Sequence, residues 1–352
     1  MKKKVLLLTD QLRVGGAETY FFKIENNMLS NNIALITAAE DGEYRNKLKN
    51  MSSFVYLSKN PVINVFKIIN IVRKEKVDVI HANSLRLSMM SLLAKVIYGK
   101  KIKLLYTKHN LTLLERIEDK VFAWYVNSFI TKLLTVCELD KKRMVDKGVK
   151  EDKIMVVSNS TDTKQFNFNS KYLKNSTGPL NIGILARLDE VKNHILFLDI
   201  MEELKETGIE FNAYIAGDGH LREIIAKEIA IRNLNVNMIG NVSDVPKFLE
   251  EIDVSLLVSH REVFPMSIIE AFSAGVLVAA VNVGGISDSV KNNETGYLIE
   301  NHSVKDFVNV IKDIYYNREK NRNIVINARK LVEEEYSLEK MIAKLEKIYM
   351  EE

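Results

Sequence analysis

Short apolar segments alternate with longer segments of helical periodicity along this chain. In the first half, apolar runs of strand length occupy residues 5–8, 33–36, 54–57, 77–80, 102–106 and 133–136. Segments in which apolar positions recur with a helical spacing lie between and after these runs, at residues 17–30, 63–74, 85–98, 113–130 and 138–147. Strands that alternate with helices in this way are typical of βα units, in which the strands form a parallel sheet.

A second series of the same kind follows. Its predicted strands occupy residues 154–157, 180–185, 211–216, 236–239, 254–258 and 277–280. The segment 167–179 is rich in Asn and Ser and ends in Gly178-Pro179, a composition typical of linkers. We therefore predict an α/β protein with domains at residues 1–168 and 169–336, followed by an amphipathic helix at residues 337–352. The length of 352 residues agrees, because a domain usually has roughly 100–200 residues.

The amino terminus places lysines before an apolar run, as a secretory signal does. Thr9 and Asp10 interrupt this run after only four residues, whereas a signal peptide needs about 7–15 apolar residues. The segment therefore predicts a first strand. A run of about 18 apolar residues, which a membrane-spanning helix requires, occurs nowhere in the sequence.

Composition and charge exclude several classes of protein. The 50 basic and 46 acidic residues leave a net charge of only +4, which is too balanced for a dedicated nucleic-acid binder. A hydrophobic content of 47% excludes a disordered chain. The single cysteine, Cys137, excludes an internal disulfide and a cysteine metal cluster, so we expect a reducing, cytoplasmic compartment.

Gly15 and Gly16 lie where the first strand turns into the first helix. Glycines at such a turn let backbone N–H groups approach an anion, although a plain tight turn has the same appearance. The segment contains neither GxGxxG nor GxxxxGK[ST], which disfavours a dinucleotide dehydrogenase and a P-loop ATPase.

Two basic residues, Arg187 and Lys192, follow the predicted strand 180–185. They would lie at the carboxyl edge of a parallel sheet, where doubly wound folds bind their ligands. Two cations there suit a diphosphate, and the alternative is a pair of solvated surface charges.

Two glutamates, Glu262 and Glu270, form an E-x7-E pattern. A helix is expected to begin near Pro265, which places Glu270 within it and Glu262 in the preceding loop. Apolar residues flank Glu270, so its carboxylate needs a hydroxyl or cationic partner, and a sugar hydroxyl would serve. The pair Gly284-Gly285 then marks a turn.

The order of these motifs resembles glycosyltransferase family 4 of the GT-B superfamily. The resemblance rests on GGAE, His109 in TKHN, the segment 158–166, ARLxxxK, AGDGxL, and E-x7-E with FPMSIIEA, and it extends from about residue 3 to the last helix. It implies two Rossmann-like domains with parallel sheets facing across a cleft. The first would bind the acceptor and the second the donor, and the C-terminal helix would pack back on the first domain.

The resemblance also implies roles for individual residues. His109, Glu262, Arg187 and Lys192 are the expected catalytic residues, with Arg187 and Lys192 on the donor diphosphate and Glu270 on the ribose. The other expected donor contacts are Gly15 and Gly16 at the diphosphate, Phe264, Pro265, Met266 and Ser267 beside the transferred sugar, and Val242, Asp244 and Lys247 around the base. His81, at the end of a predicted strand, is a candidate for the acceptor cleft.

The implied reaction is transfer of a hexose or hexosamine from a UDP- or GDP-sugar to a glycan or lipid-linked glycan. The family retains the anomeric configuration and needs no metal, and its expected setting here is bacterial surface polysaccharide synthesis. Val263, Ser158 and Ser160 depart from the family pattern and affect the sugar pocket and one loop. Alternatives are a sugar-nucleotide epimerase, a phosphorylase, or an accessory subunit that binds sugar nucleotides without turnover.

Two segments of the first domain are both basic and apolar, at residues 63–76 and 85–103. They are candidates for contact with an anionic membrane surface at the inner face of the cell membrane, since apolar residues flanked by lysines bind such surfaces. The alternative is that both are ordinary amphipathic helices whose apolar side lies in the core.

Overall fold

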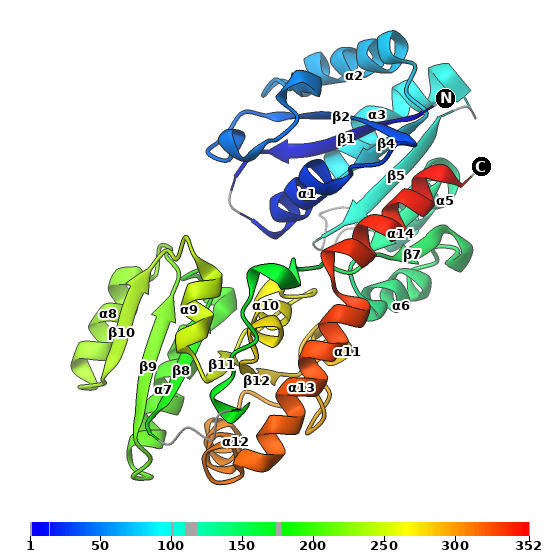
Figure 1. The fold of residues 1–352 in the computed structure, drawn as a ribbon. Helices are drawn as coiled ribbons and strands as arrows, with labels where there is room; N and C mark the ends of the chain where they lie inside the picture. Colours follow the sequence, from blue (N-terminus) through cyan, green and yellow to red (C-terminus); the bar gives the residue numbers. More distant parts are fainter. Residues whose placement is uncertain (1, 14, 100–101, 110–117, 174–177, 352) are drawn as a thin grey trace. The chain divides into compact units, whose positions relative to one another are not determined.

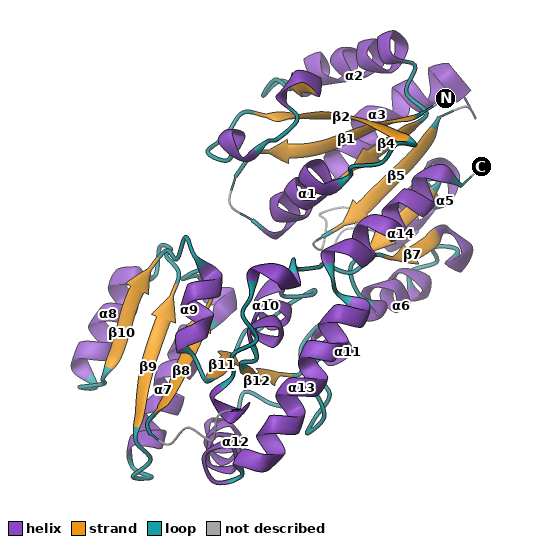
Figure 2. Cartoon of the chain, in the orientation of Figure 1, coloured by secondary structure: helices purple, strands orange, loops and turns teal. Residues whose placement is uncertain are grey.

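Parallel sheets with helices on both faces make up the chain (Figures 1 and 2). We describe a computed structural model, which defines residues 2–13, 15–99, 102–109, 118–173 and 178–351. The chain divides into two units, the first formed by residues 1–159 and 338–352 and the second by residues 160–337. The boundary predicted between residues 168 and 169 therefore falls inside the second unit.

The first unit contains a seven-stranded sheet in the order β3-β2-β1-β4-β5-β6-β7, in which all neighbours are parallel. Its strands are β1 (Lys3–Gln11), β2 (Ile33–Glu40), β3 (Phe54–Tyr56), β4 (Val79–Ala82), β5 (Lys103–Lys108), β6 (Lys132–Thr135) and β7 (Ile154–Val156). Its helices are α1 (Gly16–Asn27), α2 (Pro61–Glu75), α3 (Leu85–Tyr98), α5 (Asp119–Phe129) and α6 (Glu138–Asp146).

Local sequence signals explain where two of these helices begin. Pro61 is the first residue of α2, where its missing N–H costs nothing, and the side chain of Asn60 accepts from the N–H groups of Val62 and Ile63. Ser84 caps α3 in the same way, accepting from the N–H of Leu87. These caps give the helix that follows β4 a defined start at the carboxyl edge of the sheet.

The C-terminal helix α14 (Leu338–Met350) belongs to the first unit although it ends the chain. Its apolar side, which includes Met341, Leu345 and Tyr349, lies in one buried cluster with Phe21 of α1 and Leu7 of β1. Burial of this stripe holds α14 on one face of the first sheet, since each fully buried large side chain contributes about 1.5–3 kcal/mol.

The second unit contains a six-stranded parallel sheet in the order β10-β9-β8-β11-β12-β13. Its strands are β8 (Leu180–Leu185), β9 (Phe211–Ala216), β10 (Val236–Gly240), β11 (Val254–Leu257), β12 (Leu277–Val281) and β13 (Tyr297–Ile299). Its helices are α7 (His194–Lys205), α8 (Arg222–Ile231), α9 (Val245–Glu251), α10 (Met266–Ala274), α11 (Ile286–Ser289), α12 (Val304–Tyr316) and α13 (Arg318–Glu335).

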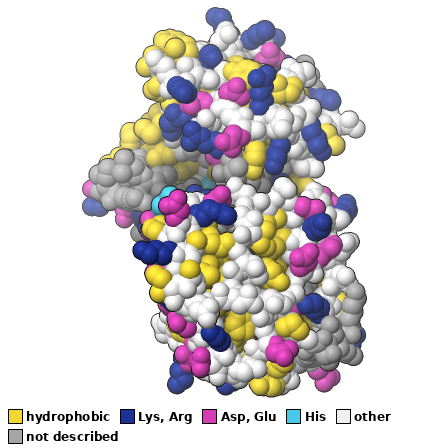
Figure 3. Space-filling view, turned by 90° about the vertical axis from the view of Figure 1, so that its left-hand side faces the viewer, with side chains coloured by type: hydrophobic (Ala, Val, Ile, Leu, Met, Phe, Trp, Pro, Cys, Tyr) yellow, Lys and Arg dark blue, Asp and Glu magenta, His cyan; other side chains and the backbone are white. Residues whose placement is uncertain are grey.

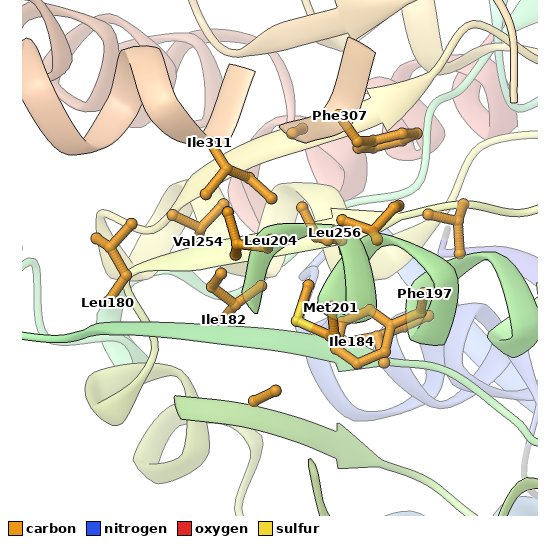
Figure 4. Close-up of a cluster of buried hydrophobic side chains, with 14 of the residues drawn as sticks. Leu180, Ile182, Ile184, Phe197, Met201, Leu204, Val254, Leu256, Phe307 and Ile311 are labelled. Carbon is orange, nitrogen blue, oxygen red and sulfur yellow. The ribbon is translucent and has the colours of Figure 1, made fainter. Parts of the chain in front are cut away.

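The core of the second unit lies between its central strands and the helices α7 and α12. Figure 4 shows Ile182 and Ile184 of β8 with Phe197 and Met201 of α7 in this cluster. Phe307 and Ile311 of α12 belong to it as well (Figure 4). Helices therefore cover the central strands β8 and β11, which explains why these strands appear in the sequence as nearly continuous apolar runs.

Two assignments made from the sequence need correction. The strand at 154–157, which was grouped with the second series, is β7 and pairs with β6 in the first sheet. The strand β13 had no expected counterpart in the sequence. The predicted helix 113–130 appears as α5 from Asp119, and its first residues, 113–117, lie outside the described part of the chain.

The first predicted strand is confirmed as β1, with its residues Val5 to Leu8 fully buried. Among the described residues, no helix has both the length and the apolar character needed to cross a membrane. On the face shown in Figure 3, Lys and Arg side chains are interspersed with Asp and Glu side chains, as the near balance of 50 basic and 46 acidic residues suggests.

Candidate active site

Two loops meet at the carboxyl edge of the second sheet. The chain runs from β8 outward to β10 and then returns to β11, which lies beside β8, so its direction across the sheet reverses between these two strands. Doubly wound folds bind ligands outside the carboxyl ends of the strands at such a reversal. The loop after β8 carries Arg187 and Lys192, and the loop after β11 carries Glu262.

Lys192 and Glu262 connect these two loops. The Nζ of Lys192 donates to Oε1 of Glu262 at 2.6 Å, and their side chains are only 18% and 9% exposed. The backbone supports the contact, because the N–H of His260 donates to the carbonyl of Val191 at 2.8 Å. Asp189 accepts from the backbone N–H of Lys192 at 3.1 Å. Both the backbone of Lys192 and its ammonium group therefore have defined partners, and the charges of Lys192 and Glu262 balance each other.

Arg187 is the accessible cation of the site. Its side chain is 74% exposed and its Nη2 lies 3.2 Å from Oδ2 of Asp189. The loop beneath it is held closely, since Gly217 has a φ of +137° and any Cβ there would overlap the carbonyl of Ala186. The N–H of Leu188 also donates to the carbonyl of Asp218 at 3.0 Å. An exposed guanidinium thus extends from a closely packed loop.

The Gly-Gly turn after β12 packs against the loop of Glu262. Gly284 has a φ of +62°, and a Cβ at this position would overlap the carbonyl oxygen of Glu262. The N–H of Gly285 donates to the carbonyl of Val263 at 2.8 Å. The contact of Gly284 explains the glycine at this position, because only a residue without a side chain permits this close approach.

Helix α10 begins at the same place. Pro265 is its N-cap, and Met266 and Ser267 open its first turn, whose N–H groups have no intrahelical partners. Phe264 is buried, and Glu270 is half-buried on the helix and engaged by neighbouring groups. The predicted start of the helix near Pro265 is confirmed. The positive end of the helix dipole at this start favours a negatively charged or oxygen-rich ligand.

The residues expected near a base follow β10, at the end of the sheet order. Asp244 is the N-cap of α9, and its Oδ1 accepts from the backbone N–H of Lys247 at 3.1 Å. Its carboxylate therefore has a structural role in the helix itself. Val242 is half-buried and the side chain of Lys247 is exposed.

In the first unit, Gly15 is the N-cap of α1 and Gly16 its first residue. A Cβ at Gly16 would meet nothing within 4 Å, so the space beside this helix start is open. His109 directly follows β5, and its Nε2 is buried without a hydrogen-bond partner among the described residues. Burial and the nearby charge of Lys108 lower the pKa of His109 to about 3, so the imidazole is neutral at pH 7.

Comparison with family models identifies the family to which this chain belongs. Residues 14–165 match the family model described as Glycosyltransferase Family 4, and residues 165–331 match the model described as Glycosyl transferases group 1. The chain belongs to glycosyltransferase family 4. It is an enzyme of the GT-B fold, as the resemblance implied.

Curated relatives and a solved structure agree with this assignment. The glycosyltransferase is 25% identical to the capsular polysaccharide biosynthesis glycosyltransferase CapM of Staphylococcus aureus, over 81% of this chain and 80% of the relative. It is 24% identical to the UDP-Gal:alpha-D-GlcNAc-diphosphoundecaprenol alpha-1,3-galactosyltransferase of Escherichia coli, over 82% and 79% of the two chains. Its fold matches Anabaena Alr3699/HepE, solved with UDP-glucose, with a TM-score of 0.83 at 18% identity over 98% of both chains.

His81 does not have the environment that was expected of it. Its side chain is fully buried, with Nδ1 2.6 Å from the hydroxyl of Tyr349 and Nε2 2.6 Å from the hydroxyl of Thr107. Burial lowers the pKa of His81 to about 3, with the nearby His109 as a second cause. Both ring nitrogens of His81 thus have protein partners, which gives this residue a structural role in the first unit.

Two polar residues beside the site of the glycosyltransferase were missed. His194, the first residue of α7, is 2% exposed, and Ser259 is 1% exposed. Neither the ring nitrogens of His194 nor the hydroxyl of Ser259 has a hydrogen-bond partner among the described residues. Burial lowers the pKa of His194 to about 4. Their sequence signal was their position immediately beside the motifs of Lys192 and Glu262.

Proposed function

We propose that this enzyme transfers a hexose or hexosamine from a UDP- or GDP-sugar to a glycan or lipid-linked glycan, with retention of configuration and without a metal. The observation that carries the proposal is the contact of Lys192 with Glu262 at the strand reversal of the second sheet. A cation and a carboxylate side by side support the proposal, because a sugar diphosphate offers a phosphate group to the first and hydroxyl groups to the second.

The charges expected in the reaction fit the residues present. Cleavage of a glycosyl phosphate bond places negative charge on the diphosphate and positive charge on the anomeric carbon. Arg187 and Lys192 would stabilise the diphosphate, and Glu262 would bind the sugar hydroxyls together with the amides of Met266 and Ser267. When the donor binds, Lys192 would exchange part of its contact with Glu262 for a phosphate oxygen.

Retention follows from attack on the side of the leaving group. The bond between the anomeric carbon and the phosphate oxygen breaks, and its electron pair goes to the diphosphate. The acceptor hydroxyl oxygen forms the new bond on the same face, and its proton goes to the leaving phosphate oxygen. In this scheme His109 remains neutral and binds a sugar hydroxyl from the first unit, which its lowered pKa of about 3 favours.

The acceptor and the biological setting are proposed from the relatives. CapM is named for capsular polysaccharide biosynthesis, and the E. coli enzyme for a galactosyl transfer to a lipid-linked N-acetylglucosamine. We infer a role in bacterial surface polysaccharide synthesis, with a glycan or lipid-linked glycan as acceptor and no nucleic-acid partner.

A location in the cytoplasm, at the inner face of the membrane, would suit a lipid-linked acceptor. Helices α2 and α3 pack against each other and expose large apolar side chains: Val62, Ile63 and Phe66 on α2, and Met89, Leu93, Val96 and Ile97 on α3. Arg73 and Lys74 in the last turn of α2 add positive charge. An apolar surface beside basic residues fits an anionic leaflet.

The first experiment is a thermal-shift titration with UDP, GDP and ADP on the wild type, Arg187→Ala and the control Arg322→Ala. Arg322 is exposed on α13 and lies outside the proposed site. A nucleotide that binds only the folded protein raises its melting temperature by mass action. We expect a shift with UDP or GDP that Arg187→Ala reduces and Arg322→Ala preserves. Equal shifts in both variants would contradict the diphosphate site.

Product analysis tests the reaction. The donor identified in this way is incubated with a short-chain lipid diphosphate that carries N-acetylglucosamine, with and without EDTA. We expect an α-configured product from an α-linked donor, in equal yield with the chelator. An epimer formed without acceptor, release that depends on phosphate, or an inverted product would each contradict the proposal.

A further inference from the structure

Several buried polar groups of the first unit lack hydrogen-bond partners among the described residues, and three of them lie on the segments that follow neighbouring strands, where the direction of the chain reverses in the first sheet. In the order β3-β2-β1-β4-β5-β6-β7, this reversal lies between β1 and β4. Asn83 follows β4, and His109 follows the adjacent β5. Tyr20 lies on α1, the helix that follows β1.

Asn83 is the most unusual member of this cluster. It is only 5% exposed, and neither its amide oxygen nor its amide nitrogen has a hydrogen-bond partner among the described residues. Its backbone extends the pairing of β4 with β1, since its N–H donates to the carbonyl of Leu8 at 2.9 Å. A buried amide without partners costs about 1–3 kcal/mol, so a molecule or group that supplies the missing hydrogen bonds is expected.

The pleat of the sheet places Asn83 near the other members. Side chains two residues apart point to the same face of a strand, so Asn83 lies on the face of His81. That face holds Thr107, whose hydroxyl lies 2.6 Å from Nε2 of His81, and His109 lies two residues beyond Thr107. The ring of Tyr20 packs edge-on against His109 with centroids 4.9 Å apart.

The two remaining polar groups are also buried. Nε2 of His109 forms no hydrogen bond within the described part of the chain, and the hydroxyl of Tyr20, a residue that is 2% exposed, lies near the side chain of Thr107 but makes no hydrogen bond of normal geometry with a described residue. Together with the amide of Asn83 they offer a hydroxyl, an uncharged ring nitrogen, an amide donor and an amide acceptor. Such a set matches alcohol groups, which both donate and accept.

Two cations at this edge, Arg86 and Lys108, have acidic partners within the described part of the chain. Arg86, in the first turn of α3, contacts Asp10 at 2.9 Å and Glu40 at 2.8 Å. Lys108, which is fully buried beside His109, lies 3.0 Å from both carboxylate oxygens of Asp140. With these charges paired, the cluster suits an uncharged ligand better than a phosphate.

We propose that Asn83 and Tyr20 form, together with His109, a binding site for the hydroxyl groups of a sugar in the first unit. The inference rests on the proposed function and extends it to two residues outside the motifs of the family resemblance. Those hydroxyls belong either to the sugar of the donor or to the first sugar of the acceptor. Asn83 and Tyr20 would then discriminate between sugars by the position of a single hydroxyl.

The test uses Asn83→Leu and Tyr20→Phe, which remove the polar atoms and keep most of the volume. The matched control is Thr37→Val, because Thr37 is also fully buried in the first unit with a hydroxyl that lacks a partner among the described residues, but it lies within β2. Each protein is titrated by calorimetry with UDP, UDP-glucose, UDP-galactose and UDP-N-acetylglucosamine, and with GDP and GDP-mannose. The KM for the N-acetylglucosamine lipid diphosphate is measured in parallel.

We expect Asn83→Leu to lower the affinity for the sugar nucleotide, or to raise the KM for the acceptor, by about 10-fold or more. A lower affinity for the sugar nucleotide would show that the ligand is the donor sugar. A raised KM for the lipid diphosphate would show that it is the acceptor sugar. Affinity for the bare nucleoside diphosphate should stay within twofold and the melting temperature should not fall. Tyr20→Phe should change whichever of the two, sugar-nucleotide affinity or acceptor KM, Asn83→Leu changes. Thr37→Val should change neither the affinity nor the KM.

Three results would overturn the inference. If both site variants behave like Thr37→Val in both measurements, the buried groups hold water only and the inference fails while the proposed function stands. If the wild type binds no sugar nucleotide, the proposed function fails and the inference fails with it. A loss of nucleoside diphosphate binding in parallel with a lower melting temperature in both site variants would assign the cluster a structural role.

Discussion

Lys192 donates from Nζ to Oε1 of Glu262 at 2.6 Å, although 70 residues separate them in the chain. The contact connects the loop after β8 with the loop after β11, so the two motifs on which the family resemblance largely rests form one site. Because both side chains are mostly buried, neither charge can lose its partner without consequence.

For this pair we predict that the effects of the two substitutions on the free energy of unfolding are not additive. Lys192→Ala should lower kcat/KM by roughly 10²-fold or more and destabilise the protein by about 3 kcal/mol, because Glu262 is left with an unbalanced buried charge. The double variant Lys192→Ala/Glu262→Gln should regain most of that stability but not the activity. Urea denaturation and steady-state kinetics on the four proteins measure both quantities. Additive losses of stability would show that the two residues act independently.

The Gly-Gly turn predicts a loss of both stability and activity in Gly284→Ala. The substitution places a Cβ against the carbonyl of Glu262 in addition to an unfavourable positive φ of +62°. The matched control is Gly208→Ala, where φ is +75° but a Cβ would meet nothing within 4 Å. The control should cost about 1 kcal/mol from backbone strain alone, and Gly284→Ala should cost distinctly more and lower kcat/KM. Equal effects would mean that the contact with Glu262 is unimportant.

Because His81 is buried in its neutral form, we predict that the free energy of unfolding falls in mild acid. Its pKa is about 3 in the folded protein, against about 6.5 in an unfolded chain. The unfolded state therefore binds more protons between these values, so the free energy of unfolding decreases as the pH falls below about 6.5, by up to about 1.4 kcal/mol per pH unit for each such histidine. His109 and His194 contribute in the same direction.

Urea denaturation at several pH values between 7.5 and 5 measures this dependence. The variant His81→Gln cannot take up the proton, so its stability should change less steeply over this range than that of the wild type. The two proteins are compared by slope, because loss of the contact with Tyr349 lowers the stability of the variant at every pH. Parallel slopes would show that His81 is not buried in its neutral form.

The apolar face of α2 and α3 predicts binding to anionic vesicles. Phe66→Glu should reduce sedimentation with phosphatidylglycerol vesicles several-fold, because it removes apolar contact and adds a repelled charge. Tyr316→Glu is the matched control, since Tyr316 on α12 is 67% exposed and Phe66 is 66% exposed. The same binding in both variants, or none in the wild type, would contradict contact through this face. The lysines at positions 100 and 101 lie outside the described residues.

Much of the fold could be predicted from local patterns. The helix α3 has the predicted bounds Leu85–Tyr98, and the strands β8 and β9 have the predicted bounds as well. These elements have strong apolar periodicity and clear end signals, which act over a few neighbouring residues. The three-residue strand β13 was not predicted, although the equally short strands β3 and β7 were.

Sheet membership was less predictable. The strand β7 has an apolar run like any other, and only its pairing with β6 places it in the first sheet. The environment of His81 was missed for a similar reason, because its partner Tyr349 lies 268 residues further along the chain. Such pairings depend on packing between distant segments, which no local pattern contains.

By itself, the sequence determined the alternation of strands and helices, the family, and the residue types at the edge of each sheet. These follow from interactions within a few residues and from motifs that stay in order along the chain. Only the tertiary structure decided that Lys192 meets Glu262, that Tyr349 of the C-terminal helix contacts His81, and that the side chain of Asn83 is buried without a hydrogen-bond partner among the described residues. Distances and burial arise when strands far apart in the chain become neighbours in a sheet, and that depends on the packing of the whole unit.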